Sequence, residues 1–223
     1  MPAEMLGESK AGVRRKGRCP LPERRRALLD AARDVFLERG FANATIDAVV
    51  ERAGGSKATV YSLFENKEGL FAALVAEAAE ELSALVQSYP LDGRIEDDLR
   101  DFGHHYLEIL TRPERLALFR LVLGECGRVP EVGEIFFRTG PQVIFRKVVD
   151  MLRSAAARGQ IAVSDAEAMA HFFIDALRGH VHMEVLLNPT RRPTPREIER
   201  HVDFVVESFL RACRPPALSL IHI

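Results

Sequence analysis

The segment Thr45–Leu70, TIDAVVERAGGSKATVYSLFENKEGL, predicts two short helices joined by a tight turn and followed by the start of a third. Thr45 is a residue type that caps helix N-termini, because its hydroxyl accepts a hydrogen bond from a free backbone N–H. Ile46, Val49 and Val50 then repeat at three-and-four spacing, which gives the first helix one apolar face. The segment therefore begins with an amphipathic helix that needs a neighbour to pack against.

A glycine pair ends this first helix. Gly54 and Gly55 take the left-handed conformation of a helix C-terminus without steric cost, and Ser56 and Asn66 are good caps for the next two helices. Two short helices joined by a glycine-containing turn of roughly three to four residues are typical of a helix-turn-helix. In such a motif the second helix enters the major groove of DNA.

Positions around this motif agree with one known pattern without a gap. They are Gly40, Phe41, Thr45, Ile46, Ala53, Gly54, Ser56, Lys57, Ala58, Thr59, Val60, Tyr61, Phe64, Asn66, Lys67 and Glu68. Together they resemble the DNA-binding domain of TetR-family transcriptional regulators, and the match covers roughly residues 22–75. Two positions depart from the pattern, since Gly55 stands where a valine usually packs the turn and Ala58 stands where glycine is commonest. We expect the first departure to loosen the turn and the second to be mild.

The resemblance implies which side chains meet DNA. We expect Lys57, Thr59 and Tyr61 to lie nearest the bases or their flanking phosphates, and Lys67 to bind a phosphate at the start of its helix. The full set of expected DNA contacts is Arg14, Arg15, Arg18, Thr45, Ser56, Lys57, Ala58, Thr59, Tyr61 and Lys67. The three arginines belong to a basic arm like the one that precedes the first helix in many TetR-family proteins.

Charge is distributed unevenly along the 223 residues, although the net charge is only -1. Residues 1–26 carry 8 basic and 3 acidic side chains, so the basic excess lies just ahead of the helix-turn-helix. A flexible basic segment in that place reaches a phosphate or the minor groove. A solvated tail without a partner is the alternative, because charged runs are often only solvated.

The rest of the chain has helical periodicity and no alternating strand segments, so we expect an all-α fold. Proline and glycine separate the helices expected near residues 94–110, 113–126, 131–139, 141–158, 164–187 and 195–213. A helix from about residue 66 to 88 connects them to the helix-turn-helix. We expect a flexible basic arm (1–21), an N-terminal three-helix helix-turn-helix DNA-binding domain (22–70), a C-terminal helical bundle for ligand binding and dimerisation (71–214) and a tail (215–223). Leu121–Pro141 also resembles the C-terminal domain of the AefR-like branch of the family.

The helix near residues 164–187 is apolar on more than one face and includes Phe172 and Phe173. A helix of this kind must be buried on all sides, and a small domain covers only one of them. In TetR-like proteins the last two long helices form a dimeric bundle, so this helix and the final one predict a homodimer. We expect charged residues at Phe173 or Phe209 to yield monomers or aggregates. A purely intramolecular core is the alternative.

Bulky apolar side chains in the C-terminal region can line a cavity between helices. A small apolar or amphipathic ligand fits such a space, and the family resemblance favours one. Ordinary core packing is the alternative for most of them. The candidates are Phe102, Tyr106, Phe119, Phe136, Phe137, Phe145 and Phe172.

No residue pattern indicates an enzyme, a cofactor or a metal. The sequence has no Gly-rich phosphate loop, no H-E-x-x-H and no nucleophile elbow. Its seven histidines and three cysteines lack paired metal-ligand spacing, and Cys126 is better explained as a small buried hydrophobe than as a redox switch. No uncharged apolar run approaches the roughly 18 residues of a membrane span, so we expect a cytoplasmic protein with no membrane partner.

These patterns predict a DNA-binding transcriptional regulator: a homodimeric repressor that leaves a near-palindromic operator in double-stranded DNA when a small ligand binds. A helical ligand carrier or enzyme domain with a degenerate helix-turn-helix is the alternative. Loss of Ser56, Lys57, Thr59 or Tyr61 would favour that alternative, but all four are present. A membrane-surface protein is a third hypothesis, which the absence of an apolar face beside the basic arm disfavours.

Overall fold

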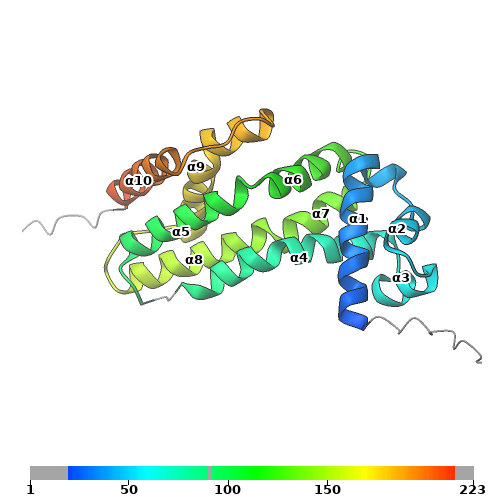
Figure 1. Ribbon diagram of the computed structural model, residues 1–223. Coiled ribbons are helices and arrows are strands. Elements are labelled where there is room, and N and C mark those ends of the chain that lie inside the picture. The colour runs from blue at the N-terminus through cyan, green and yellow to red at the C-terminus, as the bar shows by residue number, and fades with distance from the viewer. Residues whose placement is uncertain (1–19, 90–91, 214–223) are drawn as a thin grey trace, which may run out of the picture.

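The computed structural model describes residues 20–89 and 92–213, and within these ranges every regular element is a helix. Figure 1 shows α1, α2 and α3 gathered at one end of the molecule, with a longer helical bundle extending from them. The helices are α1 (Leu21–Asn43), α2 (Ile46–Ala53), α3 (Lys57–Phe64), α4 (Lys67–Ser88), α5 (Ile95–Leu110), α6 (Pro113–Glu125), α7 (Pro130–Thr139), α8 (Pro141–Ala157), α9 (Ala166–Leu187) and α10 (Pro195–Ala212). The expected all-α fold is confirmed. No helix in the described ranges is both long enough and apolar enough to cross a membrane.

Side-chain caps determine where α2, α3 and α4 begin. Thr45, Ser56 and Asn66 each accept a hydrogen bond from the backbone N–H three residues further on, at 3.2, 3.3 and 2.7 Å. A cap of this kind contributes about 1 kcal/mol. This contribution matters here because isolated helices as short as α2 and α3 are marginal in water. The three caps expected from the sequence are confirmed.

An aromatic cluster forms the centre of the small N-terminal unit. The chain turns at Gly40, where φ is 74°, and this turn brings Phe41 back against the helix that precedes it. The ring centres of Phe36, Phe41 and Phe71 lie between 5.2 and 5.6 Å apart, and all three side chains are buried. Because Phe71 belongs to α4, the cluster fastens α4 to α1.

The turn between α2 and α3 is attached to α1 by Arg24. The Arg24 guanidinium donates a hydrogen bond to the Gly54 carbonyl oxygen at 2.8 Å and occupies the space beside Gly55. Gly55 has a φ of 109°, and a Cβ at this position would collide with the guanidinium. The turn that was expected to be loose is therefore held by an arginine from another helix.

Helix α4 belongs to both parts of the molecule. Its first turns bury Leu70, Phe71 and Leu74 in the small core, while Leu82, three turns further on, lies in the large core. Figure 1 shows α4 leaving the small unit and running along the bundle beside α8. The connecting helix expected from the sequence is thus continuous between the two cores.

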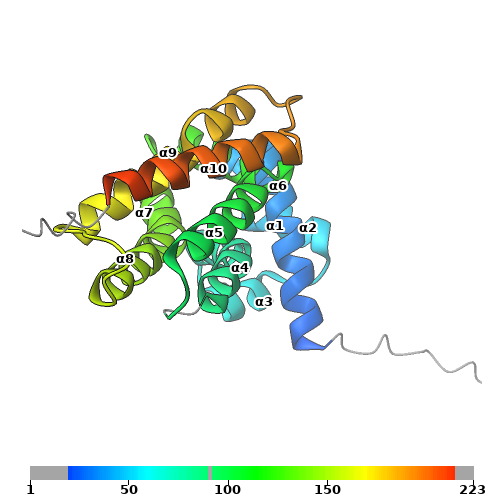
Figure 2. The same ribbon diagram turned by 90° about the vertical axis from the view of Figure 1, so that its left-hand side faces the viewer.

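The large core lies where α5, α8, α9 and α10 meet. Phe102, Phe173 and Phe209 are fully buried in it. Helix α5 approaches α10 closely because Gly103 has no side chain, and a Cβ there would lie 2.9 Å from Val202 Cγ1. Figure 2 shows α10 lying across α5 as a result of this approach.

The placement of Phe173 and Phe209 corrects one expectation about the dimer. Both side chains have no exposed surface within a single chain, and their ring centres lie 5.0 Å apart. They are therefore part of the subunit's own core. Neighbouring residues on a helix point in different directions, so Phe172 faces outward while Phe173 is buried. The large apolar side chains that α9 and α10 expose are Phe172, Met183, Leu187 and Phe204.

Replacing Gly55 with alanine should destabilise the small unit. Alanine is strained at a φ of 109°, and its methyl group would displace Arg24 from the Gly54 carbonyl. The expected loss in the free energy of unfolding is about 1–3 kcal/mol, measured by thermal unfolding followed by circular dichroism. Gly127→Ala is the matched control, because no atom lies within 4 Å of a Cβ at that position. Equal stability of the two variants would contradict the assigned role of Gly55.

Candidate functional site

Helix α3 presents one exposed face at the end of the small unit. Val60 and Phe64 are buried and anchor the helix, while Lys57, Ala58 and Tyr61 lie on its exposed side. Tyr61 is 49% exposed although it is a large aromatic residue. A lysine, a small residue and a tyrosine on one exposed helical face can approach a phosphate, a base edge and a sugar together.

Lys57 is oriented by an ion pair before any DNA binds. Its Nζ atom lies 2.7 Å from Asp47 Oδ1 on the preceding helix, and this hydrogen bond raises the pKa of the Lys57 ammonium group. Both side chains are more than half exposed, and exposed ion pairs contribute little to stability. A DNA phosphate can therefore take the place of Asp47.

The hydroxyl groups beside this face are used to shape the motif. Ser56 Oγ lies 3.0 Å from Thr59 Oγ1, and Thr45 and Ser56 each cap a helix. These residues thereby define the N-termini of α2 and α3 in the free protein. The other expected DNA contacts, Arg14, Arg15 and Arg18, lie outside the described residues.

Lys67 occupies a different place from the one expected. Its Nζ atom donates hydrogen bonds to the carbonyl oxygens of Phe41, Ala42 and Ala44 at 2.9, 3.3 and 3.2 Å. It also lies 4.5 Å from the centre of the Phe41 ring. Because an ammonium group has three protons, all of them are used within the protein. This placement speaks against the expected phosphate contact and gives Lys67 the role of holding the Gly40 turn to α4.

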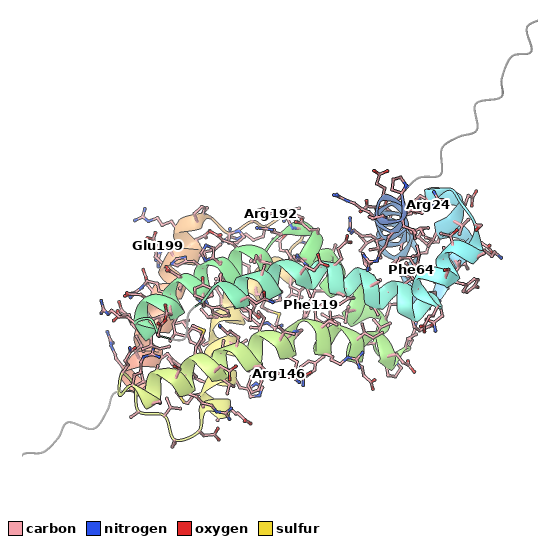
Figure 3. All side chains as sticks on the ribbon, turned by 90° about the horizontal axis from the view of Figure 1, so that it is seen from below. Arg24, Phe64, Phe119, Arg146, Arg192 and Glu199 are labelled. Atoms are coloured by element: carbon pink, nitrogen blue, oxygen red, sulfur yellow. The ribbon has the colours of Figure 1, made fainter. Side chains whose placement is uncertain are left out.

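A cavity lies inside the C-terminal bundle, where α4, α5, α6, α7, α8 and α9 converge. Val75, Ala79 and Leu82 form its α4 wall, and Ile144 of α8 contributes to another wall. Figure 3 shows Phe119 of α6 between these helices. The free volume is about 60 Å³, which holds on the order of four water molecules. Typical ligand pockets measure about 300–1,000 Å³, so a ligand must displace some of the walls.

Three of the seven aromatic residues expected to line a cavity do line this one. They are Tyr106, Phe119 and Phe136, from α5, α6 and α7. The Phe119 and Phe136 ring centres lie 5.5 Å apart, so these two rings form one continuous aromatic surface.

The other four aromatic residues lie elsewhere. Phe102 is fully buried in the large core, and Phe145 stacks on the His171 ring at 4.2 Å. Phe137 and Phe172 point outward and are more than half exposed. Helical periodicity identifies apolar faces, but it does not show which apolar face meets the cavity.

Helices α4 and α9 contribute lining residues that we did not identify from the sequence. On α4, Val75, Ala79 and Leu82 recur at the spacing of one helical face, so periodicity could have marked them. On α9, Arg178 and His182 reach the cavity from either side of a break in the helix at Gly179, where φ is 13° and ψ is -126°. Because α9 carries several other polar residues, its sequence pattern does not distinguish these two as cavity residues.

Arg178 and His182 form a polar side of the cavity. The His182 ring is 5% exposed and its centre lies 5.4 Å from that of Phe119, while the Arg178 guanidinium carbon lies 5.6 Å from the same ring centre. Burial, and then the positive charge of Arg178, lower the pKa of His182 to about 4, so the imidazole is neutral at pH 7. Burial raises the pKa of Tyr106 to about 12, so its phenol keeps its proton.

Two family profiles match the chain. Residues 28–74 match the profile of bacterial regulatory proteins of the tetR family, and residues 97–215 match the C-terminal domain of the AefR-like transcriptional repressor. The second match alone covers more than half of the chain. The chain belongs to the TetR family. It is a DNA-binding transcriptional regulator, as the helix-turn-helix indicated, and α3 is the recognition helix of this TetR-family fold.

Individual relatives agree with this assignment, two of them over most of the chain. The solved structure of the Flavonoid-responsive Regulator FrrA is 30% identical, covers 88% of this chain and 100% of that chain, and superposes with a TM-score of 0.75. An uncharacterized HTH-type transcriptional regulator of Mycobacterium tuberculosis is 27% identical over 189 residues, which are 84% of this chain and 88% of the relative. The HTH-type transcriptional activator FasR of Mycolicibacterium smegmatis is 40% identical over 82 residues, which are 36% of this chain and 37% of FasR.

Replacing Lys67 with methionine should destabilise the DNA-binding unit. Three carbonyl oxygens would lose their donor, while methionine keeps most of the apolar stem. The expected loss in the free energy of unfolding is about 1–3 kcal/mol, seen as a fall in Tm of about 2–4 °C for each kcal/mol.

Lys57→Met is the matched control for this experiment. The Tm should not change, because the ion pair with Asp47 is exposed. The slope of log K against log salt for duplex DNA should instead decrease by about 0.9 if Lys57 contacts one phosphate. The reverse result, an unchanged Tm and a smaller slope for Lys67→Met, would place Lys67 on the DNA.

Proposed function

We propose that this protein is a homodimeric repressor that leaves its operator when a small molecule occupies the cavity in the C-terminal bundle. The observation that carries the proposal is that α4 lines the cavity and also begins in the core of the DNA-binding unit. We place its action in the cytoplasm, on double-stranded DNA. We assign it no catalytic reaction, because its relatives are transcriptional regulators.

The size of the cavity supports a coupling between ligand binding and movement. A free volume of about 60 Å³ is smaller than a typical ligand requires. Entry of a ligand therefore pushes the walls apart, and Ala79 and Leu82 of α4 are among the residues displaced. Since α4 is continuous, its displacement reaches Phe71 in the aromatic cluster of the DNA-binding unit.

A second contact joins the cavity to the DNA-binding unit through α6. The Glu125 carboxylate, at the end of α6, accepts a hydrogen bond from the Ala42 N–H at 3.1 Å, next to the turn at Gly40. Glu125 is only 9% exposed, so this contact is protected from water. Phe119 of the same helix lines the cavity. A shift of α6 would therefore displace the turn at Gly40, which lies just ahead of the helix-turn-helix.

The proposed dimer forms through α9 and α10. Four large apolar side chains are exposed on these two helices, Phe172, Met183, Leu187 and Phe204, and exposed apolar surface of this kind can form an interaction site. A two-fold axis through these helices would present two copies of α3 to successive turns of the major groove, about 34–36 Å apart. The operator of such a dimer is near-palindromic, and a rotation of α4 would change the spacing of the recognition helices.

A relative supports the small-molecule response. FrrA, which is 30% identical to this chain, is described as flavonoid-responsive. For this chain we propose a small apolar or amphipathic effector, in agreement with the aromatic surface formed by Phe119 and Phe136.

Selection of duplexes from a random DNA library by the full-length protein tests the operator. An inverted repeat with half-sites one helical turn apart is the expected result. Enrichment of a single, unrepeated half-site would contradict the dimeric repressor.

Ligand response is tested on the selected operator. A compound that weakens DNA binding must itself bind less tightly to the operator-bound protein by the same factor, typically about 5–150-fold. Equal affinities for the free and operator-bound protein would contradict an inducing role for that compound.

Replacing Phe204 with aspartate should separate the dimer and leave each subunit folded. Phe204 is 70% exposed within one chain, so a charge there is not buried unless two chains associate. The mass measured by light scattering should fall from twice 24.9 kDa to 24.9 kDa. Phe173→Asp is the contrasting variant and should unfold the subunit, because it places a charge in the core. A wild-type mass of one subunit would contradict the proposed dimer.

A further inference from the structure

The described residues that line the cavity include polar and basic side chains but no acidic one. Of the described residues that line it, the polar ones are Tyr106, Arg115, Arg178 and His182, and none is aspartate or glutamate. The remaining walls are apolar side chains of α4, α5, α6, α7 and α8. The cavity is therefore a mainly apolar space, and the charged residues among its described lining are the arginines Arg115 and Arg178.

Arg178 differs from the other arginines of this region. Arg191 pairs with Glu184 and Glu197, and Arg120 donates to two backbone carbonyl oxygens near the end of α9. No hydrogen bond or ion pair joins Arg178 to another residue in the described part of the chain, and its guanidinium instead lies over the Phe119 ring. A guanidinium has five donors suited to an oxyanion, and at Arg178 these donors face a cavity.

We propose that the effector of this regulator is an amphipathic acid, with an apolar body against Phe119, Phe136 and the α4 wall and an acidic oxygen group, such as a carboxylate, on Arg178. The inference rests on the proposed function, since it names the ligand class of the same cavity. His182 follows Arg178 beyond the break in α9 at Gly179, also lines the cavity, and completes the polar end of the site.

Ligands of other charge are disfavoured by the same groups. A cation would be repelled by the Arg178 guanidinium, and none of the described lining residues is a carboxylate. A neutral apolar molecule would exclude water from Arg178 and give its charge no partner, which is unfavourable. An acid supplies both the missing partner and the apolar surface, so the cavity selects by charge as well as by shape.

Acid binding should be linked to proton uptake by His182. Of the described residues that line the cavity with His182, the titratable ones are Arg178 on the same helix, Arg115 on α6 and Tyr106 on α5. The positive charge of Arg178 favours the neutral imidazole, and Tyr106 is protonated and uncharged at pH 7. A bound anion offsets the arginine charge and raises the pKa of His182. Affinity for the acid should therefore increase as the pH falls from about 7 toward 5.

Two fluorescent probes that differ only in charge test the ligand class. One is 1-anilinonaphthalene-8-sulfonate, and the other is N-phenyl-1-naphthylamine, which has the same ring system without the sulfonate. The full-length protein should bind the sulfonate more tightly, and Arg178→Leu should weaken sulfonate binding on the order of 10–100-fold while leaving the neutral probe unaffected. Arg178→Lys should retain part of the preference. Arg146→Leu, on the exposed side of α8, is the matched control and should change neither affinity (Figure 3).

A blocking variant separates this inference from the function on which it rests. Ala79→Phe fills the cavity from α4, so it should abolish binding of both probes if they occupy this space. If both probes bind unchanged to that variant, the cavity is not the ligand site and the proposed function fails as well. If both probes are lost in Ala79→Phe but bind the wild type equally tightly, the cavity is the ligand site and the preference for an acid is overturned.

Calorimetry in two buffers with different heats of ionisation tests the role of His182. The sulfonate stays ionised throughout, so any proton taken up on binding comes to the protein. Fractional proton uptake near pH 6 is expected for the wild type and for Arg146→Leu, and it should disappear in His182→Gln. If the wild type takes up no proton on binding, His182 is not part of the anion site.

Discussion

The arrangement of this protein depends on one helix having side chains in two separate cores. With 22 residues, α4 spans about 33 Å at the usual rise per residue. Phe71 is locked into the aromatic cluster of the DNA-binding unit, and Leu82 is locked into the core of the bundle. A helix held at both ends cannot absorb a displacement locally, because packed side chains do not deform gradually. It must move as a unit or not at all.

The contact between α6 and the turn at Gly40 changes what such a movement does. A DNA-binding unit attached through α4 alone could rotate about that single attachment. A movement of α4 would then not set a defined orientation of α3. The Glu125–Ala42 hydrogen bond provides a second attachment, and two attachments define an orientation. Both attached helices also form walls of the cavity. The two helices that support the DNA-binding unit are therefore also among the walls of the cavity.

The DNA-binding unit was predictable from the sequence because its determinants are local. Caps at Thr45, Ser56 and Asn66 act over three residues, and glycine and proline end helices by rules that need no tertiary information. The family resemblance rested on the same short segment. The partners of Lys67 were not predictable from local signals. Its position at a helix N-terminus suggests a phosphate contact, whereas its partners are carbonyl oxygens 23 to 26 residues earlier in the chain.

The cavity was less predictable because it forms where six helices converge. Phe172 and Phe173 are adjacent and equally apolar, yet one is 55% exposed and the other is fully buried. No periodicity separates such a pair without knowledge of the neighbouring helices. Arg178 and His182 were overlooked for the same reason, since their importance comes from the apolar walls that other helices supply.

The contact between Arg24 and the glycine turn has a consequence for the sequences of related proteins. Gly55 leaves a space that the Arg24 guanidinium occupies, and Arg24 holds the turn that a valine would otherwise pack. Without Arg24 the turn at Gly55 would lose this attachment, and with a larger residue at position 55 the Arg24 guanidinium would collide with the side chain. Each residue therefore restricts which substitutions are tolerated at the other position. Across relatives of this protein, glycine at the second position of the turn should co-occur with arginine near the start of the first helix. Relatives that have a valine at this position of the turn should show a wider range of residues at the position of Arg24.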